Sequence, residues 1–456
     1  MIWTILTKLK PIGAPILENY LRLKDRVKLA SLKIRGKSTV KTLINPEALT
    51  SDKVVIFVAY PAGPIASMHI RLLNRFQKIG YSVLFVSNHA NPQYVFASCL
   101  DQRWVFLFRH PFGRDFGAFK DATLYLHKIT QDTGNQFRKI VYINDSVATI
   151  DRDEPALIAH LDKEEADFSG ITENYDKGLH VGSFVMSVGQ RAFYHKRIIR
   201  YWQKFQSLST RRYAIGRGEL GFSKAMRRAG FVPDVLWTLA RMKLALLQKS
   251  TSELLQIAEA MEPHFRRQID SPMNIIDARV VRFLGRDNIG LPNDSVVDKI
   301  LDKLQNKKKK IRPMAAGPAL MAAMVAQATP QSQNQDSREF RFVRYRENFM
   351  GLSRSWQSSQ AAELGREDLV NLLLLHIFRG SQIHHGAAPL LFVGAGLIKK
   401  DVVLRRIVEP FDIDVLLERT GVTTEERVEI SRDILAKGHP YSMRGWAKLL
   451  NDWDFT

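Results

Sequence analysis

Asn144, Asp145 and Ser146 stand directly after an apolar run from Ile140 to Ile143. A continuous apolar run is typical of a β-strand that is buried on both faces. In open α/β sheets, ligands bind at the carboxyl ends of the strands. A carboxylate among neutral hydrogen-bonding groups at that edge suits a sugar nucleotide and a divalent metal. An Asx turn after an ordinary strand explains the same three residues equally well.

A second group of residues lies between positions 109 and 120, where an expected strand meets an expected helix. Gly113 and Gly117 allow close backbone approach, and a helix N-terminus presents N–H groups to an anion. The basic residues of this segment are Arg109, Arg114 and Lys120. Asp115 is able to accept a hydrogen bond from a ribose or a base. We expect a nucleotide-binding loop; the alternative is a tight turn with Asp115 as the helix N-cap.

A third candidate is Glu219, at the expected start of a helix over residues 220–229. A carboxylate there suits general-base catalysis, and the alternative is a first-turn Glu favoured by the helix dipole. The surrounding Gly216 to Gly221 matches G-x-G-x-x-G by letter, but it lacks a preceding apolar strand and a downstream ribose acid, so we reject dinucleotide binding. Asp151 and Asp153 match Asp-x-Asp, and we interpret them as helix-capping residues.

A folded domain must position these candidate residues. In residues 51–240, strand patterns alternate with helix patterns, and this alternation predicts such a domain. The alternation indicates a layered α/β domain with a largely parallel sheet. Helices are expected over residues 65–79, 117–130, 156–161, 190–205 and 220–229. Strands are expected over residues 54–60, 82–87, 104–108, 140–143, 167–172 and 183–188.

The composition restricts the class of protein. Hydrophobic residues make up 45% and charged residues 25% of the 456 positions, as in a soluble globular protein. The formal charge of +21 implies an anionic partner. A single cysteine, Cys99, suits a reducing compartment. With no transmembrane or signal-peptide pattern, we expect a cytoplasmic protein, peripheral at the inner face of the cell membrane if it contacts lipid.

The first 50 residues predict a basic amphipathic helix. Apolar residues recur at spacings of 4, 3, 4, 3 and 4, at Ile16, Tyr20, Leu23, Val27, Ala30 and Ile34. The other positions include Arg22, Lys24, Arg26, Lys28, Lys33 and Arg35. The helix either lies on an anionic membrane surface or packs on the α/β domain with its basic face in solvent.

The C-terminal half divides into three expected regions. Residues 241–306 predict a helical extension, residues 307–338 a flexible linker or insertion, and residues 339–456 a mostly helical region. No zinc-ligand spacing, nucleophile elbow or Walker A loop occurs, and we assign no metal to His384 and His385.

Residues 53–235 resemble the rhamnan synthesis protein F family, glycosyltransferase-like proteins of bacterial surface polysaccharide assembly. The segments that carry the resemblance are Val54–Tyr60, Phe112–Lys120, Tyr142–Ser146, Asp167–Thr172, His180–Phe184 and Gly218–Leu220. A weaker match runs from Pro389 to Asp401 and is similar to the closing segment of that family.

The resemblance implies a GT-A-like nucleotide-sugar-binding fold and a hexosyltransferase that extends a rhamnan, O-antigen or capsule-type polysaccharide. It implies that Asp115 contacts the nucleotide, that Asp145 holds Mg²⁺ or Mn²⁺ beside Asn144 and Ser146, and that Glu219 is the catalytic base. Many GT-A enzymes carry two acids where Asn144–Ser146 carries one, so metal dependence is open. The expected partners are a nucleotide-sugar donor and a glycan or lipid-linked acceptor. A non-catalytic GT-A-like scaffold is the alternative, and a nucleic-acid-binding protein is a weaker one, since no nucleic-acid module is recognisable.

Overall fold

The computed structural model describes residues 2–60, 64–88, 99, 103–175, 178–254, 256–258, 260, 366–378, 380–410, 412–438 and 443–453. The chain divides into two compact units, Met1–Thr238 with Gln382–Thr456, and Leu239–Ser381. The predicted linker at 307–338 lies outside the described residues, as does most of the predicted extension at 241–306. Residues 382–453, which the sequence assigned to a separate C-terminal region, belong to the same unit as the α/β domain.

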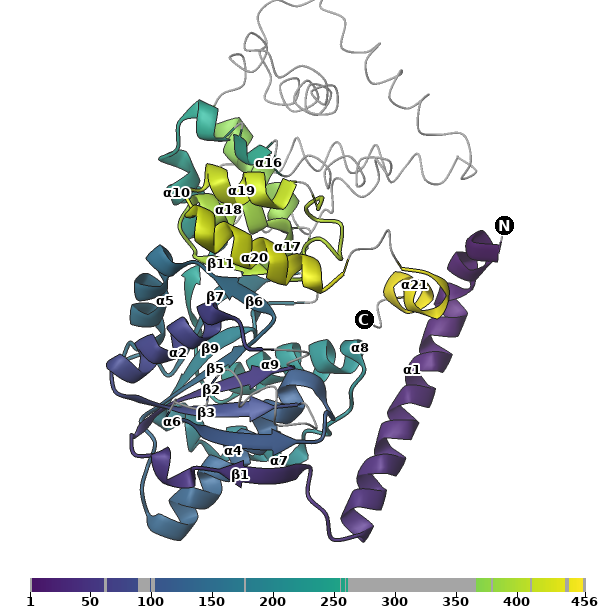
Figure 1. Ribbon diagram of the computed structural model, residues 1–456, viewed down its shortest axis with the longest axis vertical. Helices are drawn as coiled ribbons and strands as arrows, with labels where there is room; N and C mark the ends of the chain where they lie inside the picture. The colour runs from purple at the N-terminus through teal and green to yellow at the C-terminus, as the bar shows by residue number, and fades with distance from the viewer. Residues whose placement is uncertain are drawn as a thin grey trace, which may run out of the picture. The chain divides into compact units, whose positions relative to one another are not determined.

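A nine-stranded mixed sheet forms the centre of the first unit (Figure 1). Six parallel strands build most of it: β2 (Lys53–Ala59), β3 (Tyr81–Ser87), β4 (Val105–Arg109), β5 (Lys139–Asn144), β7 (Phe168–Asn174) and β10 (Asp234–Trp237). The antiparallel strands are β1 (Val40–Ile44), β8 (His180–Val181) and β9 (Val185–Gly189). The order is β1-β4-β3-β2-β5-β9-β7-β10, with β8 paired to β7. The prediction of a layered α/β domain with a largely parallel sheet is therefore confirmed.

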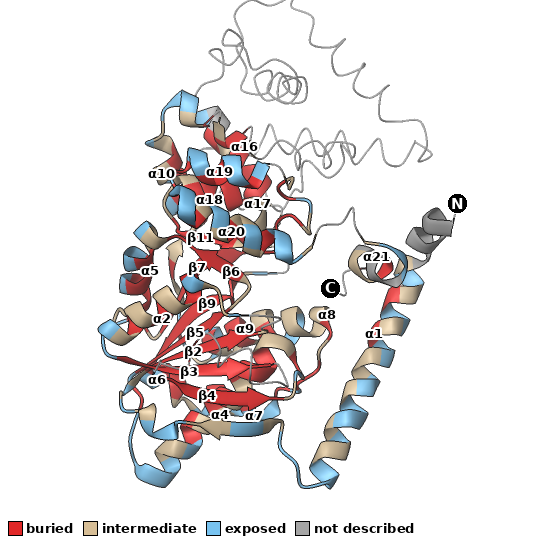
Figure 2. Cartoon of the chain, in the orientation of Figure 1, coloured by how far each residue is buried: buried red, intermediate tan, exposed pale blue. Residues whose placement is uncertain are grey.

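The strands were recognisable in the sequence because they are apolar on both faces. All residues of β3 and β5 are buried, and the sheet is red along its centre in Figure 2. The unit's main helices are α2 (Ser67–Lys78), α4 (Arg114–Thr133), α5 (Glu154–Leu161), α6 (Gln190–Phe193), α7 (Lys196–Lys204) and α9 (Leu220–Arg228). In α2, Met68, Leu72 and Phe76 are buried, as the predicted helical spacing requires. Gly134 ends α4 in the left-handed conformation at φ 77°.

The helix that carries Glu219 is longer and less regular than predicted. It begins with α8 (Arg211–Tyr213), continues as a π-helical segment at Ala214–Glu219, and runs directly into α9. Glu219 therefore lies in the interior of a continuous helical stretch. The alternative in which Glu219 is a dipole-favoured first-turn residue is wrong, because the helical stretch begins eight residues earlier in the sequence, at Arg211. Single π turns inside helices are frequent at functional sites.

A short second sheet joins the C-terminal residues to the α/β domain. β11 (Leu397–Lys399) pairs antiparallel with β6 (Val147–Thr149), the strand that directly follows Ser146. Helices α17 (Gln382–His385) and α18 (Ala387–Phe392) precede β11, and α19 (Asp412–Arg419), α20 (Thr424–Ala436) and α21 (Gly445–Asp452) follow it. The second unit contains α10 (Leu239–Leu247) and α16 (Arg366–Phe378).

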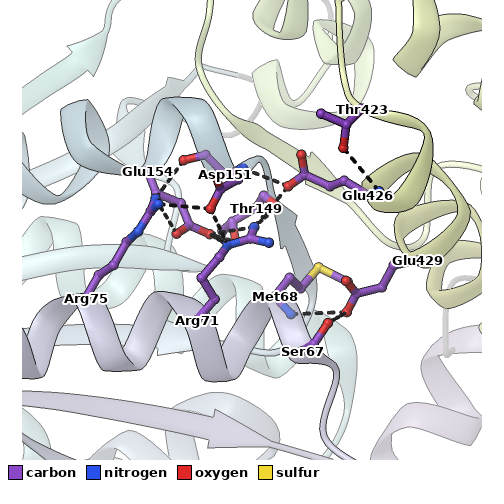
Figure 3. Close-up of polar contacts among 10 residues, drawn as sticks. All are labelled: Ser67, Met68, Arg71, Arg75, Thr149, Asp151, Glu154, Thr423, Glu426 and Glu429. Atoms are coloured by element: carbon purple, nitrogen blue, oxygen red, sulfur yellow. Dashed lines mark hydrogen bonds and ion pairs between the residues drawn. The ribbon is translucent and has the colours of Figure 1, made fainter.

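An ion-pair network holds α20 against α2 (Figure 3). Arg71 and Arg75 of α2 both pair with the Glu154 carboxylate, which is 0% exposed, and with Asp151. Glu426 of α20 accepts from Arg71 at 3.0 Å and from the Asp151 backbone N–H at 2.7 Å. Asp153 occupies the N-cap position of α5, as the helix-capping interpretation predicts, but its side chain makes no capping hydrogen bond. The Asp151 carboxylate instead pairs with the two arginines of α2. The network fixes α20, one of the helices that follow β11.

Within the described residues, no helix is both long and apolar enough to cross a membrane. The N-terminal helix α1 extends over Ile2–Ile34, so it begins well before the predicted residue 16 and ends close to the predicted residue 35. It contains Pro11 and Pro15.

Candidate functional site

The candidate site lies at the carboxyl ends of β2 and β5, where the strand order reverses. From β2 the chain moves outward through β3 and β4, and it then returns to place β5 on the other side of β2. Such a switch point opens a crevice between two neighbouring strand ends, and ligands of open α/β sheets bind there. Asp145 spans this point: its carboxylate accepts a hydrogen bond from the Tyr60 backbone N–H at 2.9 Å, and its backbone N–H donates to the Val58 carbonyl at 2.9 Å.

Asn144 connects Asp145 to the first turn of α4. Its side-chain nitrogen Nδ2 donates to the Asp115 carboxylate at 2.7 Å, and its side-chain oxygen Oδ1 accepts from the Ser146 N–H at 3.2 Å. The second bond is an Asx turn, so the simpler interpretation of these residues describes their local conformation. The first bond brings two segments predicted as separate donor-binding groups into one site. Gly113 is the N-cap of α4, so the alternative that Asp115 caps this helix is wrong.

Asp115 lies among several charges. The pKa of Asp115 is raised to about 6, mainly by burial; the carboxylates of Asp145 and Glu219 contribute to the rise, and the cations of Lys399 and Arg114 oppose it. The influence of Glu219 and Lys399 on Asp115 means that residues from three distant segments share one electrostatic environment. A carboxyl group with a pKa near neutrality exchanges protons readily and suits hydrogen bonding to a hydroxyl or an imide.

Lys399 enters the site from the C-terminal segment. The β11–β6 pairing aligns Lys399 with Val147, and its ammonium donates to the Ser146 hydroxyl at 2.6 Å. The ammonium also lies 5.1 Å from the centre of the Phe184 ring. Burial lowers the pKa of Lys399, and the charges of Asp401, Asp115 and Glu219 counteract this. The sequence pointed to residues 389–401 only through the family resemblance and assigned no role to Lys399.

Glu219 is held by two residues of the His180–Phe184 segment, to which the sequence assigned no role. Its carboxylate accepts a hydrogen bond from the Ser183 hydroxyl at 2.9 Å and lies 3.9 Å from Nε2 of His180. Nδ1 of His180 lies 2.8 Å from the Gly178 carbonyl, which only accepts, so Nδ1 carries hydrogen and Nε2 faces the carboxylate. At Gly218 an added Cβ would lie 2.5 Å from the Phe116 ring, which explains why glycine precedes Glu219.

Four of the residues predicted to bind the nucleotide-sugar donor contact other residues of the protein. They are Arg109, Gly113, Gly117 and Lys120. Arg109 is 0% exposed; its guanidinium donates to the Asp121 carboxylate at 2.8 Å, to the Phe112 carbonyl at 2.8 Å and to the Asn88 side chain. Lys120 donates to the Phe205 carbonyl at 2.6 Å. Added Cβ atoms would meet protein backbone at Gly113, 2.6 Å from Ser207 Cα, and at Gly117, 2.1 Å from the Phe112 oxygen. These four residues therefore stabilise the conformation of the loop through contacts within the protein.

Arg114 differs from them. It adopts φ 51°, a left-handed conformation that costs a non-glycine residue of order 1 kcal/mol or more and recurs at ligand sites. One of its terminal guanidinium nitrogens is buried without a hydrogen-bond partner in the described part of the chain. Its charge acts on Asp115. Of Arg109, Arg114 and Lys120, Arg114 is therefore the one that keeps an unpartnered side-chain nitrogen among the described residues.

The substitution Arg109→Lys tests the internal role of this residue. Lysine keeps the charge but cannot make three divergent hydrogen bonds, so it leaves buried acceptors unsatisfied. We expect the free energy of unfolding to fall by about 2 kcal/mol, measured by urea denaturation. The matched control Arg191→Lys, at a side chain that is 82% exposed, should leave it unchanged. A variant that is as stable as the parent but binds nucleotide more weakly would show that Arg109 is a donor ligand instead.

The side chains around Asp145 form a poor set of ligands for a divalent metal. Within the described residues, no group of three or more histidine, cysteine, aspartate or glutamate side chains is arranged to hold a metal ion. Asp145 already accepts from Tyr60, and the positive charge of Lys400 acts near it. The lysines at the end of β11 supply positive charge where the family resemblance implies a metal.

Comparison with known proteins gives one distant relative. No family model matches the chain. A segment of 187 residues, 40% of this chain, is 25% identical to a Sinorhizobium fredii protein named "Uncharacterized protein y4gN". That segment spans about half of the relative, 48% of its length.

Proposed function

We propose that this protein is a glycosyltransferase that transfers a sugar from a nucleotide diphosphate donor to a growing cell-surface polysaccharide. The observation that carries the proposal is the convergence of Asp115, Asp145, Lys399 and Glu219 at the switch point of a mostly parallel sheet. Their mutual effects on pKa support it. The order of the strands, with the antiparallel β9 between β5 and β7, supports the GT-A-like fold that the resemblance implies.

Each part of the donor has a group of suitable chemistry. Asp115 and Asn144 form a hydrogen-bonding pair that suits the ribose hydroxyls or the base. Lys399 and Arg114 supply positive charge for the diphosphate, and charge-assisted hydrogen bonds to phosphate are stronger than neutral ones. In this proposal the developing charge on the departing nucleoside diphosphate is stabilised by the same cations.

Glu219 acts on the acceptor. Its carboxylate is 32% exposed, so an acceptor hydroxyl can approach it, and Ser183 orients it by a hydrogen bond. Glu219 takes the proton as the hydroxyl oxygen attacks the sugar's anomeric carbon and the bond to the diphosphate breaks. Nε2 of His180, 3.9 Å from the carboxylate, provides a neighbouring position for that proton.

Binding of nucleotide sugars to the purified chain tests this function. In isothermal titration calorimetry with a panel of nucleoside diphosphates and their sugar conjugates, we expect at least one to bind with a dissociation constant in the micromolar range, about 1–100 μM. Arg114→Gln, which removes the cation placed for an anion, should weaken that binding. The exposed Arg191 replaced by Gln is the control. Absence of binding across the panel would refute the proposal.

A non-catalytic scaffold is the second candidate, and one observation favours it. The single strand-end acid, Asp145, is engaged by the Tyr60 N–H, so its carboxylate also has a structural task. A scaffold would bind the donor without hydrolysing or transferring its sugar, and product analysis by mass spectrometry separates the two.

A further inference from the structure

The helix α1 exposes the apolar stripe that its sequence predicts. Ile12, Ile16, Tyr20, Leu23, Val27 and Ile34 are between 59% and 86% exposed. In a helix that packs on its own domain through this face, these side chains would be buried. Of the two alternatives for this helix, packing on the α/β domain with only the basic face in solvent is therefore wrong for the apolar stripe. The outer surface of α1 appears in the pale blue and tan of exposed and intermediate residues in Figure 2.

The opposite face of α1 holds the helix to the protein. The Asp25 carboxylate accepts from the Ser209 N–H at 2.7 Å, and Glu18 accepts from the Thr210 hydroxyl at 3.3 Å. The Arg22 guanidinium lies 5.4 Å from the centre of the Tyr213 ring. Further toward the N-terminus, Ala14 and Leu17 pack with Leu449 of α21 and with Trp453, which directly follows α21. These contacts fix the rotation of α1, so its apolar stripe points away from the domain.

Basic side chains border the stripe on both sides. At 3.6 residues per turn, Lys24 and Lys28 lie along one border and Arg26 and Lys33 along the other, and all four are exposed. An amphipathic helix with an exposed apolar face and basic borders is the pattern of a helix that lies in the interface of an anionic bilayer. Each basic residue near such a surface adds about 1 kcal/mol of attraction, which is about a fivefold gain in binding.

The apolar stripe could also pack against the same stripe of a second copy of the chain, because the spacing 4, 3, 4, 3 is the repeat of a coiled coil. In a coiled-coil pair, however, the residues that border the stripe of one helix face those of the other. Here both borders are basic, so two copies would bring like charges together along the seam. The charge pattern therefore favours an anionic lipid surface over self-association.

We propose that α1 is an interfacial membrane helix that inserts the stripe Ile12–Ile34 among anionic lipids. Its anchoring segment, Ser209–Tyr213, runs directly into the π-helical segment that ends at Glu219. Docking thus places the helix bearing Glu219 next to the helix that contacts lipid. This arrangement fits a lipid-linked acceptor, an inference that rests on the glycosyltransferase proposal, whereas the docking itself does not.

Flotation of the full chain with lipid vesicles tests the docking. Vesicles of neutral phosphatidylcholine are compared with vesicles containing about one third phosphatidylserine, at about 0.1 M salt. We expect the parent to float with the anionic vesicles and to stay behind with the neutral ones. Lys24→Gln, Arg26→Gln, Lys28→Gln and Lys33→Gln together should lower the partition coefficient at least about a hundredfold. Arg22 is kept, since it packs on Tyr213.

The apolar contribution needs its own variant. Ile16→Ser, Leu23→Ser and Val27→Ser together should lower the partition coefficient at least about tenfold. The control replaces three exposed valines elsewhere, Val232, Val415 and Val428, with serine and should bind like the parent. All these side chains are exposed, and unchanged thermal unfolding verifies that the variants fold.

Three outcomes would overturn the proposal: equal binding to neutral and anionic vesicles, no binding by the parent, or a parental dimer in analytical ultracentrifugation that the serine variant converts to monomer without any change in vesicle binding. Nucleotide calorimetry on the same variants should be unaffected. A protein that binds vesicles but no nucleotide would therefore support the docking and refute the glycosyltransferase function.

Discussion

The substitution Glu219→Gln should lower the turnover number of sugar transfer at least about a hundredfold, the usual scale for the loss of a general base. Glutamine retains the size of the side chain and an oxygen that accepts from Ser183, but it cannot take a proton. The dissociation constant of the donor should stay within a factor of about two, because the proposed role of Glu219 concerns the acceptor. Single-turnover kinetics and calorimetry measure the two quantities.

A matched control is Glu165→Gln, which removes an exposed carboxylate outside the site. Neither variant should change the unfolding temperature by more than about 2 °C. Transfer at the parental rate by Glu219→Gln would assign the base to another residue. Weaker donor binding together with slower transfer would instead assign Glu219 to the donor side of the site.

The substitution Lys399→Met should weaken the binding of a nucleoside diphosphate about 10- to 100-fold, the value of one charge-assisted hydrogen bond at a partly buried position. Binding of the corresponding nucleoside, which lacks phosphate, should change little. Lys399→Arg should restore most of the affinity. The exposed Lys437 replaced by Met, in the same C-terminal region, serves as the control.

The same experiment separates lysine from metal as the source of positive charge. If Lys399 neutralises the diphosphate, a chelator should leave the donor affinity of the parent unchanged. If donor affinity is lost on chelation, and Lys399→Met binds normally, the implied metal at Asp145 carries the diphosphate. Asp145→Asn then provides a check, since it should abolish any metal dependence while its amide oxygen can still accept from the Tyr60 N–H.

Local sequence was sufficient to predict the strands, because burial on both faces leaves a continuous apolar run. Val54–Tyr60 and Ile140–Ile143 coincide with β2 and β5 to within one or two residues. The strand-end position of Asn144, Asp145 and Ser146 follows from the same run. Strand–helix alternation was also enough to indicate parallel pairing, since a helix between two strands returns the chain to the same edge of the sheet.

The local sequence was not sufficient to predict the role of each residue in the 109–120 segment. Charge and glycine content marked the segment as an anion site, yet Arg109 and Lys120 donate to protein oxygens and the two glycines accommodate protein backbone. A cation in a loop pairs with whichever acceptors the fold brings near. Asp121, Ser207 and Phe205 become neighbours only through tertiary packing.

Two features of the site depend on contacts between distant segments. Lys399 reaches Ser146 across 253 residues of chain through the pairing of two three-residue strands, which no local pattern predicts. The spacing of Ile16 to Ile34 predicts an amphipathic helix, but only the contacts of Glu18 and Asp25 decide that the stripe faces outward. Periodicity determines which side chains share a face of a helix. What covers that face is decided by the free energy of packing among elements far apart in the chain.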